Sequence, residues 1–108
     1  MKCKNCPIWN VMDLLGKKWN MFLIKVIRNN PNIRFNEILV ELGINPRTLT
    51  LRLCELEEWG IINKKKFNTI PPRVEYSVSE IGEKLFLSFK DLDAWAKKYV
   101  PESKLIDN

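Results

Sequence analysis

The amino-acid sequence predicts a mostly α-helical domain that carries one small β-hairpin. Two observations lead to this fold class. Apolar residues recur at helical spacing in five segments, and one further segment alternates apolar and polar residues with the period of a half-buried strand. At 108 residues the chain has the usual size of a single domain. We therefore expect one domain over residues 1–100 and a short C-terminal tail over residues 101–108.

The first two predicted helices lie between Pro7 and Gly16 and between Trp19 and Asn29, before Asn30 and Pro31. Proline suits the first turn of a helix, and glycine commonly follows the last turn. The apolar positions are Ile8, Val11, Met12 and Leu15 in the first helix, and Trp19, Phe22, Leu23, Val26 and Ile27 in the second.

A third and a fourth helix follow at very short separation. The third has Asn36 as its expected N-cap and Gly43 at its end. The fourth has Asn45 as its expected N-cap, Pro46 in its first turn and Gly60 at its end. Two helices joined by so short a turn predict a helix-turn-helix unit. Their apolar stripes are Phe35, Ile38, Leu39 and Leu42 in the third helix, and Leu49, Leu53 and Leu56 in the fourth.

The apolar period then changes from helical to strand-like. Residues 61–67 form a short run with three lysines at its centre, and residues 68–72 contain paired prolines that cannot continue a strand. Because Val74, Tyr76 and Val78 alternate with polar residues, these segments predict a two-stranded hairpin. Ser79 is the expected N-cap of a long last helix that Pro101 terminates. The apolar stripe of that helix is Ile81, Leu85, Phe89, Leu92, Ala96 and Tyr99, broadened by Phe86 and Trp95.

A helix-turn-helix unit followed by a basic hairpin is typical of a winged helix-turn-helix domain that binds DNA. With the leucine stripe of the fourth helix facing the core, the N-terminal half of this helix exposes basic, hydroxyl and apolar side chains. Its glutamates fall in the C-terminal half, where phosphates would repel them, so the N-terminal half is the candidate reading end. The candidate DNA-contacting residues are Arg47, Thr48, Thr50 and Leu51, with Arg52 nearer the core boundary.

The hairpin supplies further basic candidates. Because side chains alternate along a strand, Lys64 and Lys66 share one face while Lys65 points to the other. We expect one or both of Lys64 and Lys66, together with Arg73 after the turn, to reach phosphate or the minor groove. Arg34, just before the third helix, is a further phosphate candidate. The formal net charge of +5 agrees with an acidic partner such as double-stranded DNA.

Composition excludes or disfavours several other classes of function. The chain contains no histidine, which excludes hydrolases with a His-containing triad, and we expect no enzymatic activity, no cofactor and no metal site. The odd number of cysteines, three, disfavours a disulfide-stapled secreted fold. No apolar run approaches the roughly 20 residues of a membrane span, and Asn10 and Asp13 interrupt the first apolar segment. We therefore expect no membrane anchor, no secretory signal and a cytoplasmic location.

Longer stretches of the sequence resemble the HxlR-type regulators, a branch of the MarR-like winged helix proteins. The resemblance covers about residues 3–98. Leu51 and Cys54 stand where many relatives carry polar or basic side chains, so the base contacts of relatives cannot be transferred to this chain. The most specific matching run is Pro71-Pro72-Arg73-Val74-Glu75-Tyr76, and the other matching stretches are Cys6-Pro7, Gly16-Lys17-Lys18-Trp19, Arg34 to Leu39, Pro46 to Leu53, Glu55-Leu56-Glu57, Gly60-Ile61-Ile62 and Glu80 to Leu85.

The resemblance implies a transcriptional regulator that binds a pseudo-palindromic operator as a homodimer. It is also compatible with a small-molecule or oxidant effector. It also implies that the N- and C-terminal helices form the dimer interface. The wide apolar stripe of the last helix agrees with this implication, because it is broader than a small monomer needs. The candidate interface residues are Ile8, Val11, Phe86, Phe89, Trp95 and Tyr99.

Cys3 and Cys6 form a C-x-x-C pair, and three uses of this pair stay open. Cys6 precedes Pro7 at the start of the first helix, where the helix dipole and neighbouring lysines stabilise a thiolate. Oxidation of Cys6 would then report oxidants or electrophiles. The pairs of two protomers would alternatively hold a shared zinc ion, and two inert thiols are the third interpretation.

Two other classes of function also stay open. One is a winged-helix module that binds proteins and has no specific affinity for DNA, since a fold does not determine a function. The other is a small thiol redox protein that uses Cys3 and Cys6. The single hairpin and the terminal position of the motif disfavour the second class, because thioredoxin-like proteins place C-x-x-C among alternating strands and helices.

Overall fold

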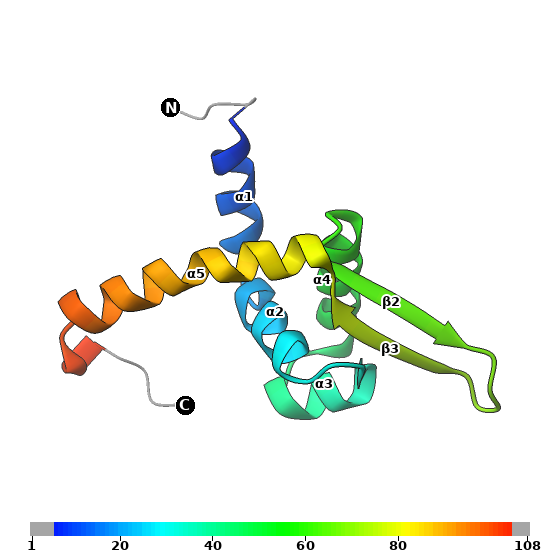
Figure 1. Ribbon diagram of the computed structural model, residues 1–108. Helices are drawn as coiled ribbons and strands as arrows, with labels where there is room; N and C mark the ends of the chain where they lie inside the picture. Colours follow the sequence, from blue (N-terminus) through cyan, green and yellow to red (C-terminus); the bar gives the residue numbers. More distant parts are fainter. Residues whose placement is uncertain (1–5, 105–108) are drawn as a thin grey trace.

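A computed structural model of the protein describes residues 6–104. Within that range the chain forms five α-helices and three short β-strands, which confirms the mostly helical fold class (Figure 1). The elements are α1 (Pro7–Leu15), α2 (Asn20–Asn29), β1 (Ile33–Arg34), α3 (Phe35–Leu42), α4 (Pro46–Glu58), β2 (Ile62–Phe67), β3 (Arg73–Val78) and α5 (Glu80–Tyr99), followed by a 3-10 turn (Glu102–Lys104).

The sheet has three antiparallel strands in the order β1-β3-β2, whereas the sequence predicts only the β2–β3 hairpin. The additional strand β1 pairs Ile33 with Tyr76 and Arg34 with Glu75. A strand of two residues is too short to show an alternating pattern, which explains why the periodicity did not predict it. By pairing with β3, β1 attaches the start of α3 to the root of the hairpin.

The predicted helix caps are right at two positions and wrong at a third. Asn45 caps α4 through its side-chain oxygen, and the Ser79 hydroxyl accepts a hydrogen bond from the Gly82 N–H at 2.9 Å. Asn36, however, lies inside α3, which begins at Phe35. The N-cap residue is Arg34, and the Glu37 carboxylate accepts its N–H at 2.9 Å, which is the bond that a glutamate at the third helical position makes in a capping box.

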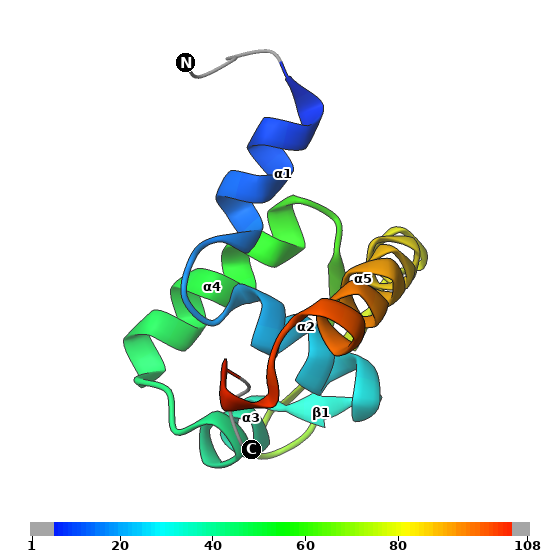
Figure 2. The same cartoon turned by 90° about the vertical axis from the view of Figure 1, so that its left-hand side faces the viewer.

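The core lies where α2, α3 and α4 meet the sheet, and α2 runs through its centre. Its members are Leu14, Leu23, Ile24, Ile27, Ile33, Ile38, Ile44, Leu49, Leu53, Leu56, Ile61, Ile62 and Tyr76. Figures 1 and 2 show that α1 and the C-terminal half of α5 extend away from this core. Among the described residues, no helix is long and apolar enough to cross a membrane.

The apolar stripe predicted on α5 divides between the core and the surface. Leu85, Phe86 and Phe89 pack against the core, whereas Ile81 and Leu92 are 66% and 56% exposed. A helical period shows which side chains share a face, and it does not show how far the neighbouring elements extend along that face. In this chain the core ends near the middle of α5, before Leu92, whereas Ile81 in the first turn is exposed although Leu85, one turn later, packs against the core.

Candidate nucleic-acid interface

The helix-turn-helix unit consists of α3, a three-residue turn and α4. Gly43 ends α3 in the left-handed conformation (φ 63°), which glycine adopts without strain and which reverses the chain toward α4. The Asn45 side-chain oxygen then accepts the N–H groups of Arg47 at 2.9 Å and Thr48 at 3.4 Å. These contacts fix where α4 begins, and therefore which of its residues lie in the first, outward-facing turn.

The rotation of α4 about its own axis is determined by its buried leucines. Leu49, Leu53 and Leu56 are at most 3% exposed, so the opposite face of the helix points to solvent. That face presents Arg47 and Leu51, and Leu51 is 59% exposed although it is apolar. Within residues 6–104 the Arg47 guanidinium makes no ion pair.

The two threonines of α4 differ in their exposure. Thr50 is exposed, and its hydroxyl donates to the Pro46 carbonyl at 3.0 Å, which leaves the lone pairs of the oxygen available to a donor. Thr48 is half-buried. The exposed N-terminal half of α4 is thus formed by Arg47, Thr50 and Leu51, with Thr48 on its flank.

Arg52 does not join this face. Its guanidinium Nη1 donates to Glu55 Oε1 at 3.3 Å, and its side chain is only 26% exposed. Residues three apart lie on the same side of a helix, and here that side faces the junction between α1 and α2. The structure therefore separates Arg52 from the other candidate DNA-contacting residues.

Lys64 and Lys66 lie on the face of the hairpin that is directed toward α4. Lys64 is directly opposite Tyr76 and Lys66 is opposite Val74, so both lysines share the face of the buried tyrosine. Lys64 also lines a small hollow together with Thr50 of α4. The predicted common face of the two lysines is confirmed, and this face adjoins the exposed threonine of α4.

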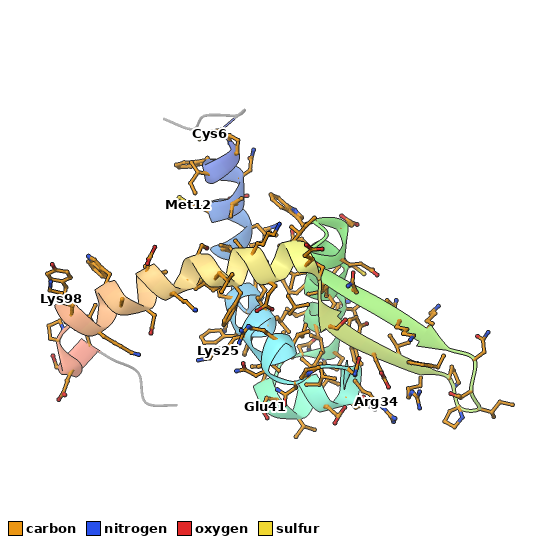
Figure 3. The ribbon with its side chains drawn as sticks, in the orientation of Figure 1. Cys6, Met12, Lys25, Arg34, Glu41 and Lys98 are labelled. Carbon is orange, nitrogen blue, oxygen red and sulfur yellow. The ribbon has the colours of Figure 1, made fainter. Side chains whose placement is uncertain are left out.

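Arg73 lies on the other face of the hairpin. It is opposite Phe67 in the register, and its guanidinium stacks on the Phe67 ring at 4.0 Å and pairs with Glu75 at 3.0 Å. Lys65 stacks on the same ring at 5.1 Å. Arg34, which is opposite Glu75, lies beside Arg73 at an open hollow between α3 and the hairpin turn (Figure 3). The basic candidates of the wing thus form two groups on opposite faces.

Cys6 is half-buried at the N-terminus of α1, at the end of that helix farthest from the core (Figure 3). Cys54 is exposed on α4, and Cys3 lies outside the described residues. Across the described part of the chain, no three His, Cys, Asp or Glu side chains are grouped to hold a metal ion. The arrangement of the C-x-x-C pair as a whole stays a prediction.

The candidate dimer surface consists of apolar side chains on α1 and α5. Ile8, Trp95 and Tyr99 are 62%, 56% and 60% exposed, whereas Val11 is half-buried. Phe86 and Phe89 are half-buried with their rings in edge contact at 5.6 Å between centroids. Five further exposed apolar side chains on these two helices were not among the predicted interface residues, namely Trp9, Met12, Ile81, Leu87 and Leu92.

Glu55, which joins α4 to Lys17 and Asn20 across the domain, was not predicted from the sequence. Lys17 precedes Glu55 by 38 residues and Asn20 precedes it by 35. The only local signal was the spacing of Arg52 and Glu55, which are three residues apart on one helix.

A helix-turn-helix whose second helix exposes its N-terminal half, followed by a basic hairpin, defines a winged helix-turn-helix protein. The sequence profile of the HxlR-like helix-turn-helix family matches residues 14–104. The chain belongs to this family of transcriptional regulators. Relatives include the HTH-type transcriptional regulator YdeP of Bacillus subtilis, which is 37% identical over 100 residues that span 89% of this chain and 75% of YdeP.

Solved structures of transcriptional regulators, and of one protein described as a redox regulator, also resemble this chain. The HTH-type transcriptional regulator YodB of Bacillus subtilis, in its reduced form, superimposes with a TM-score of 0.79 at 33% identity and covers 88% of this chain and 94% of that one. The redox regulator HypR in its reduced form has a TM-score of 0.76 at 33% identity, over 86% of this chain and 92% of HypR. These similarities confirm the winged helix-turn-helix fold class and the family that the sequence resembles.

Proposed function

We propose that the protein is a sequence-specific DNA-binding regulator whose α4 enters the major groove while the hairpin contacts the adjacent backbone. One observation carries this proposal: the exposed end of α4 and the Lys64 and Lys66 face of the hairpin adjoin each other. The acidic residues of α4 fall in its C-terminal half, away from that reading end. A surface of this kind matches the phosphate backbone in charge and the major groove in shape.

Each exposed side chain of α4 suits a particular DNA contact. The exposed guanidinium of Arg47 is suited to a bidentate contact with guanine, typically about 1–3 kcal/mol of discrimination between bases. Leu51 is suited to the methyl group of thymine, and the Thr50 hydroxyl oxygen, whose proton is donated to the Pro46 carbonyl, is suited to accept a hydrogen bond from a base amino group. Arg34 and Arg73, on the opposite face of the hairpin, are suited to the phosphates that flank the wing. Arg52 is left out of the proposed contacts because its guanidinium is bonded to Glu55 on the side of α4 that faces the junction between α1 and α2, whereas Arg73, although paired with Glu75, lines the open hollow beside the hairpin turn.

The second part of the proposal is a homodimer formed through α1 and α5. Both helices project from the core and expose large apolar side chains, which water disfavours. A two-fold dimer would place its two α4 helices in successive major grooves, about 34–36 Å apart, on a pseudo-palindromic operator. Sedimentation equilibrium tests this part: a dimer is expected for the wild type, and a shift to monomer for Trp95→Asp.

Fluorescence anisotropy tests the DNA-binding part. The duplex from upstream of the protein's own gene is compared with a scrambled duplex over a range of salt concentrations. Arg47→Ala is expected to abolish the preference for the upstream duplex. Lys97→Ala, which removes the same charge from a side chain that is 78% exposed on α5, is expected to preserve it. Equal, weak binding of both duplexes would contradict sequence specificity, and no binding at low salt would favour the protein-interaction module.

We further propose that Cys6 makes the regulator redox-responsive. Two observations support this proposal. YodB has been solved in reduced and diamide-treated forms, and HypR in reduced and oxidized forms. Cys6 is the N-cap residue of α1, where unpaired N–H groups and the positive end of the helix dipole stabilise a thiolate. Attack of the thiolate on a peroxide would give a sulfenic acid, and the peroxide would be reduced to water or an alcohol. Cys6→Ser is expected to remove the effect of peroxide on DNA binding while Cys54→Ser retains it. The opposite pattern would assign the response to Cys54.

A further inference from the structure

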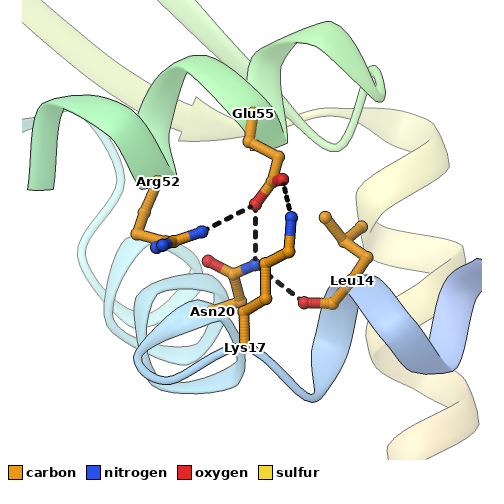
Figure 4. Close-up of polar contacts among 5 residues, drawn as sticks. All are labelled: Leu14, Lys17, Asn20, Arg52 and Glu55. Atoms are coloured by element: carbon orange, nitrogen blue, oxygen red, sulfur yellow. Dashed lines mark hydrogen bonds and ion pairs between the residues drawn. The ribbon is translucent and has the colours of Figure 1, made fainter. Parts of the chain in front are cut away.

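A polar cluster connects α4 to the junction between α1 and α2 (Figure 4). The Glu55 carboxylate accepts hydrogen bonds from Lys17 Nζ, from Asn20 Nδ2 at 3.2 Å and from Arg52 Nη1 at 3.3 Å. Asn20 Nδ2 also donates to the Leu14 carbonyl at 2.8 Å, in the last turn of α1. A continuous chain of hydrogen bonds therefore runs from the end of α1 through Asn20 to Glu55. We call these five residues the Glu55 cluster.

The Glu55 cluster lies at the edge of the core, with Asn20 buried and the side chain of Lys17 partly exposed. Asn20 is fully buried, and its side-chain carbonyl has no hydrogen-bond partner among the described residues. An apolar residue would avoid the cost of that unpaired oxygen, so the asparagine is poorly explained by stability alone. Burial raises the pKa of Glu55, but hydrogen bonds from Lys17 and Asn20 and the charges of Lys17 and Arg52 outweigh it and hold the pKa below its ordinary value. The carboxylate is therefore ionised at neutral pH.

We propose that Glu55 is a positioning residue that sets the tilt of α4 relative to α1. The buried leucines of α4 fix which face of the helix points outward, but apolar packing is not directional and leaves the tilt less constrained. Hydrogen bonds to a carboxylate are directional and short, and they attach α4 at one point on its flank. The proposal rests on the proposed function, because the tilt matters when α1 carries the dimer contacts and two α4 helices must match two major grooves.

Two variants with the same change of charge separate this role from simple electrostatics. Glu55→Gln and Glu58→Gln each remove one negative charge from α4, and Glu58 is exposed at its C-terminal end. Reduced repulsion of phosphate predicts tighter DNA binding for both variants. The positioning role predicts the opposite for Glu55→Gln: binding of the upstream duplex about tenfold weaker, the effect of losing roughly one charge-assisted hydrogen bond. Binding of the scrambled duplex is expected to stay unchanged or to increase.

Spacing provides a readout that a general loss of stability would not change. Footprinting defines the protected site, and one base pair is then inserted or removed at its centre. The wild type and Glu58→Gln are expected to discriminate against the altered spacings, whereas Glu55→Gln is expected to bind all three duplexes with similar affinity. Equal discrimination by Glu55→Gln and Glu58→Gln would overturn the proposal.

A measurement without DNA keeps this test independent of the proposed function. Spin labels on Cys54 of α4 and on a Met12→Cys variant of α1, with Cys3 and Cys6 replaced by serine, report the distance between the two helices. The labelled protein is diluted with unlabelled protein so that distances within one chain dominate. The distribution is expected to be narrow for the parent and Glu58→Gln and broad for Glu55→Gln. Equal widths would overturn the positioning role, whereas failure of the unlabelled wild type to bind any duplex would instead contradict the proposed function.

Discussion

Gly82 in the first turn of α5 is the position where one added methyl group would disturb the junction between α5 and the wing. The glycine is buried and faces Ile61, the residue before β2, and Val78, the last residue of β3. A Cβ atom there would lie 2.1 Å from the Ile61 carbonyl oxygen and 2.8 Å from Val78 Cγ1. Contacts this short cannot persist, so in Gly82→Ala the helix and the chain at Ile61 must move apart.

The expected cost follows from what this movement disrupts. The Ile61 carbonyl accepts both the N–H and the hydroxyl of Ser79 at 2.9 Å, and each such bond contributes about 1 kcal/mol. Overpacking of a filled site typically costs about 1–3 kcal/mol. Alanine in a helix gains at most about 1 kcal/mol over glycine. We therefore expect Gly82→Ala to lower the free energy of unfolding by about 2–4 kcal/mol.

Urea unfolding at fixed protein concentration, followed by circular dichroism, measures this change in the free energy of unfolding. Thermal unfolding under the same conditions measures the accompanying change in Tm. For a domain of roughly this size, about 1 kcal/mol corresponds to about 4–8 °C in Tm, so Tm is expected to fall by about 10 °C or more. Asp91→Ala, at an exposed position of the same helix, serves as the control and is expected to change stability little. An unchanged or raised Tm for Gly82→Ala would refute the reasoning, because helix propensity would then dominate over the close contacts.

Three further predictions concern the wing, the α4 cap and the pH dependence. Replacing Lys64 and Lys66 by alanine is expected to reduce the magnitude of the slope of log K against log salt by about 0.9 for each phosphate that the wing no longer neutralises. Lys65→Ala, which removes an ammonium that stacks on the hairpin itself, is expected to change the slope less per lysine replaced, and equal changes per lysine would contradict the assignment of faces. Asn45→Ala is expected to destabilise the protein by about 1 kcal/mol in urea unfolding, and no change would contradict the cap. Because the pKa of Glu55 is lowered from 4.5 in the folded state, its contribution to stability is complete above that value and is lost as pH falls through the folded pKa. The difference in Tm between the wild type and Glu55→Gln should therefore shrink as the pH is lowered below 4.5, and a constant difference would show that the carboxylate charge does not contribute to stability.

Local patterns were sufficient to predict most of the fold. The caps at Asn45 and Ser79 depend on residues at most three positions away, and the structure has both. The common face of Lys64 and Lys66 follows from strand alternation alone. The prediction failed at Asn36 because α3 begins at Phe35, with Arg34 as its N-cap residue and the Arg34 N–H bonded to the Glu37 carboxylate.

The candidate DNA contacts were predictable to the extent that they depend on one helix or one hairpin. The outward position of Arg47 and Leu51 follows from the leucine stripe on the opposite face of α4. The separation of Arg73 from Lys64 and Lys66 follows from the register of β2 and β3, which depends on a turn length that local patterns do not determine. That these side chains contact DNA stays a prediction, which the binding experiments test.

The sequence by itself determined the helices, the wing, the family and the outward face of α4, because periodicity and capping act between residues a few positions apart. Only the tertiary structure decided that β1 joins the sheet, that Ile81 and Leu92 are exposed, and that Glu55 holds Arg52 away from the reading face. These features depend on partners that lie far apart in the chain, such as Asn20 and Glu55, 35 residues from each other. The packing of the whole chain brings such partners together, and no local pattern records it.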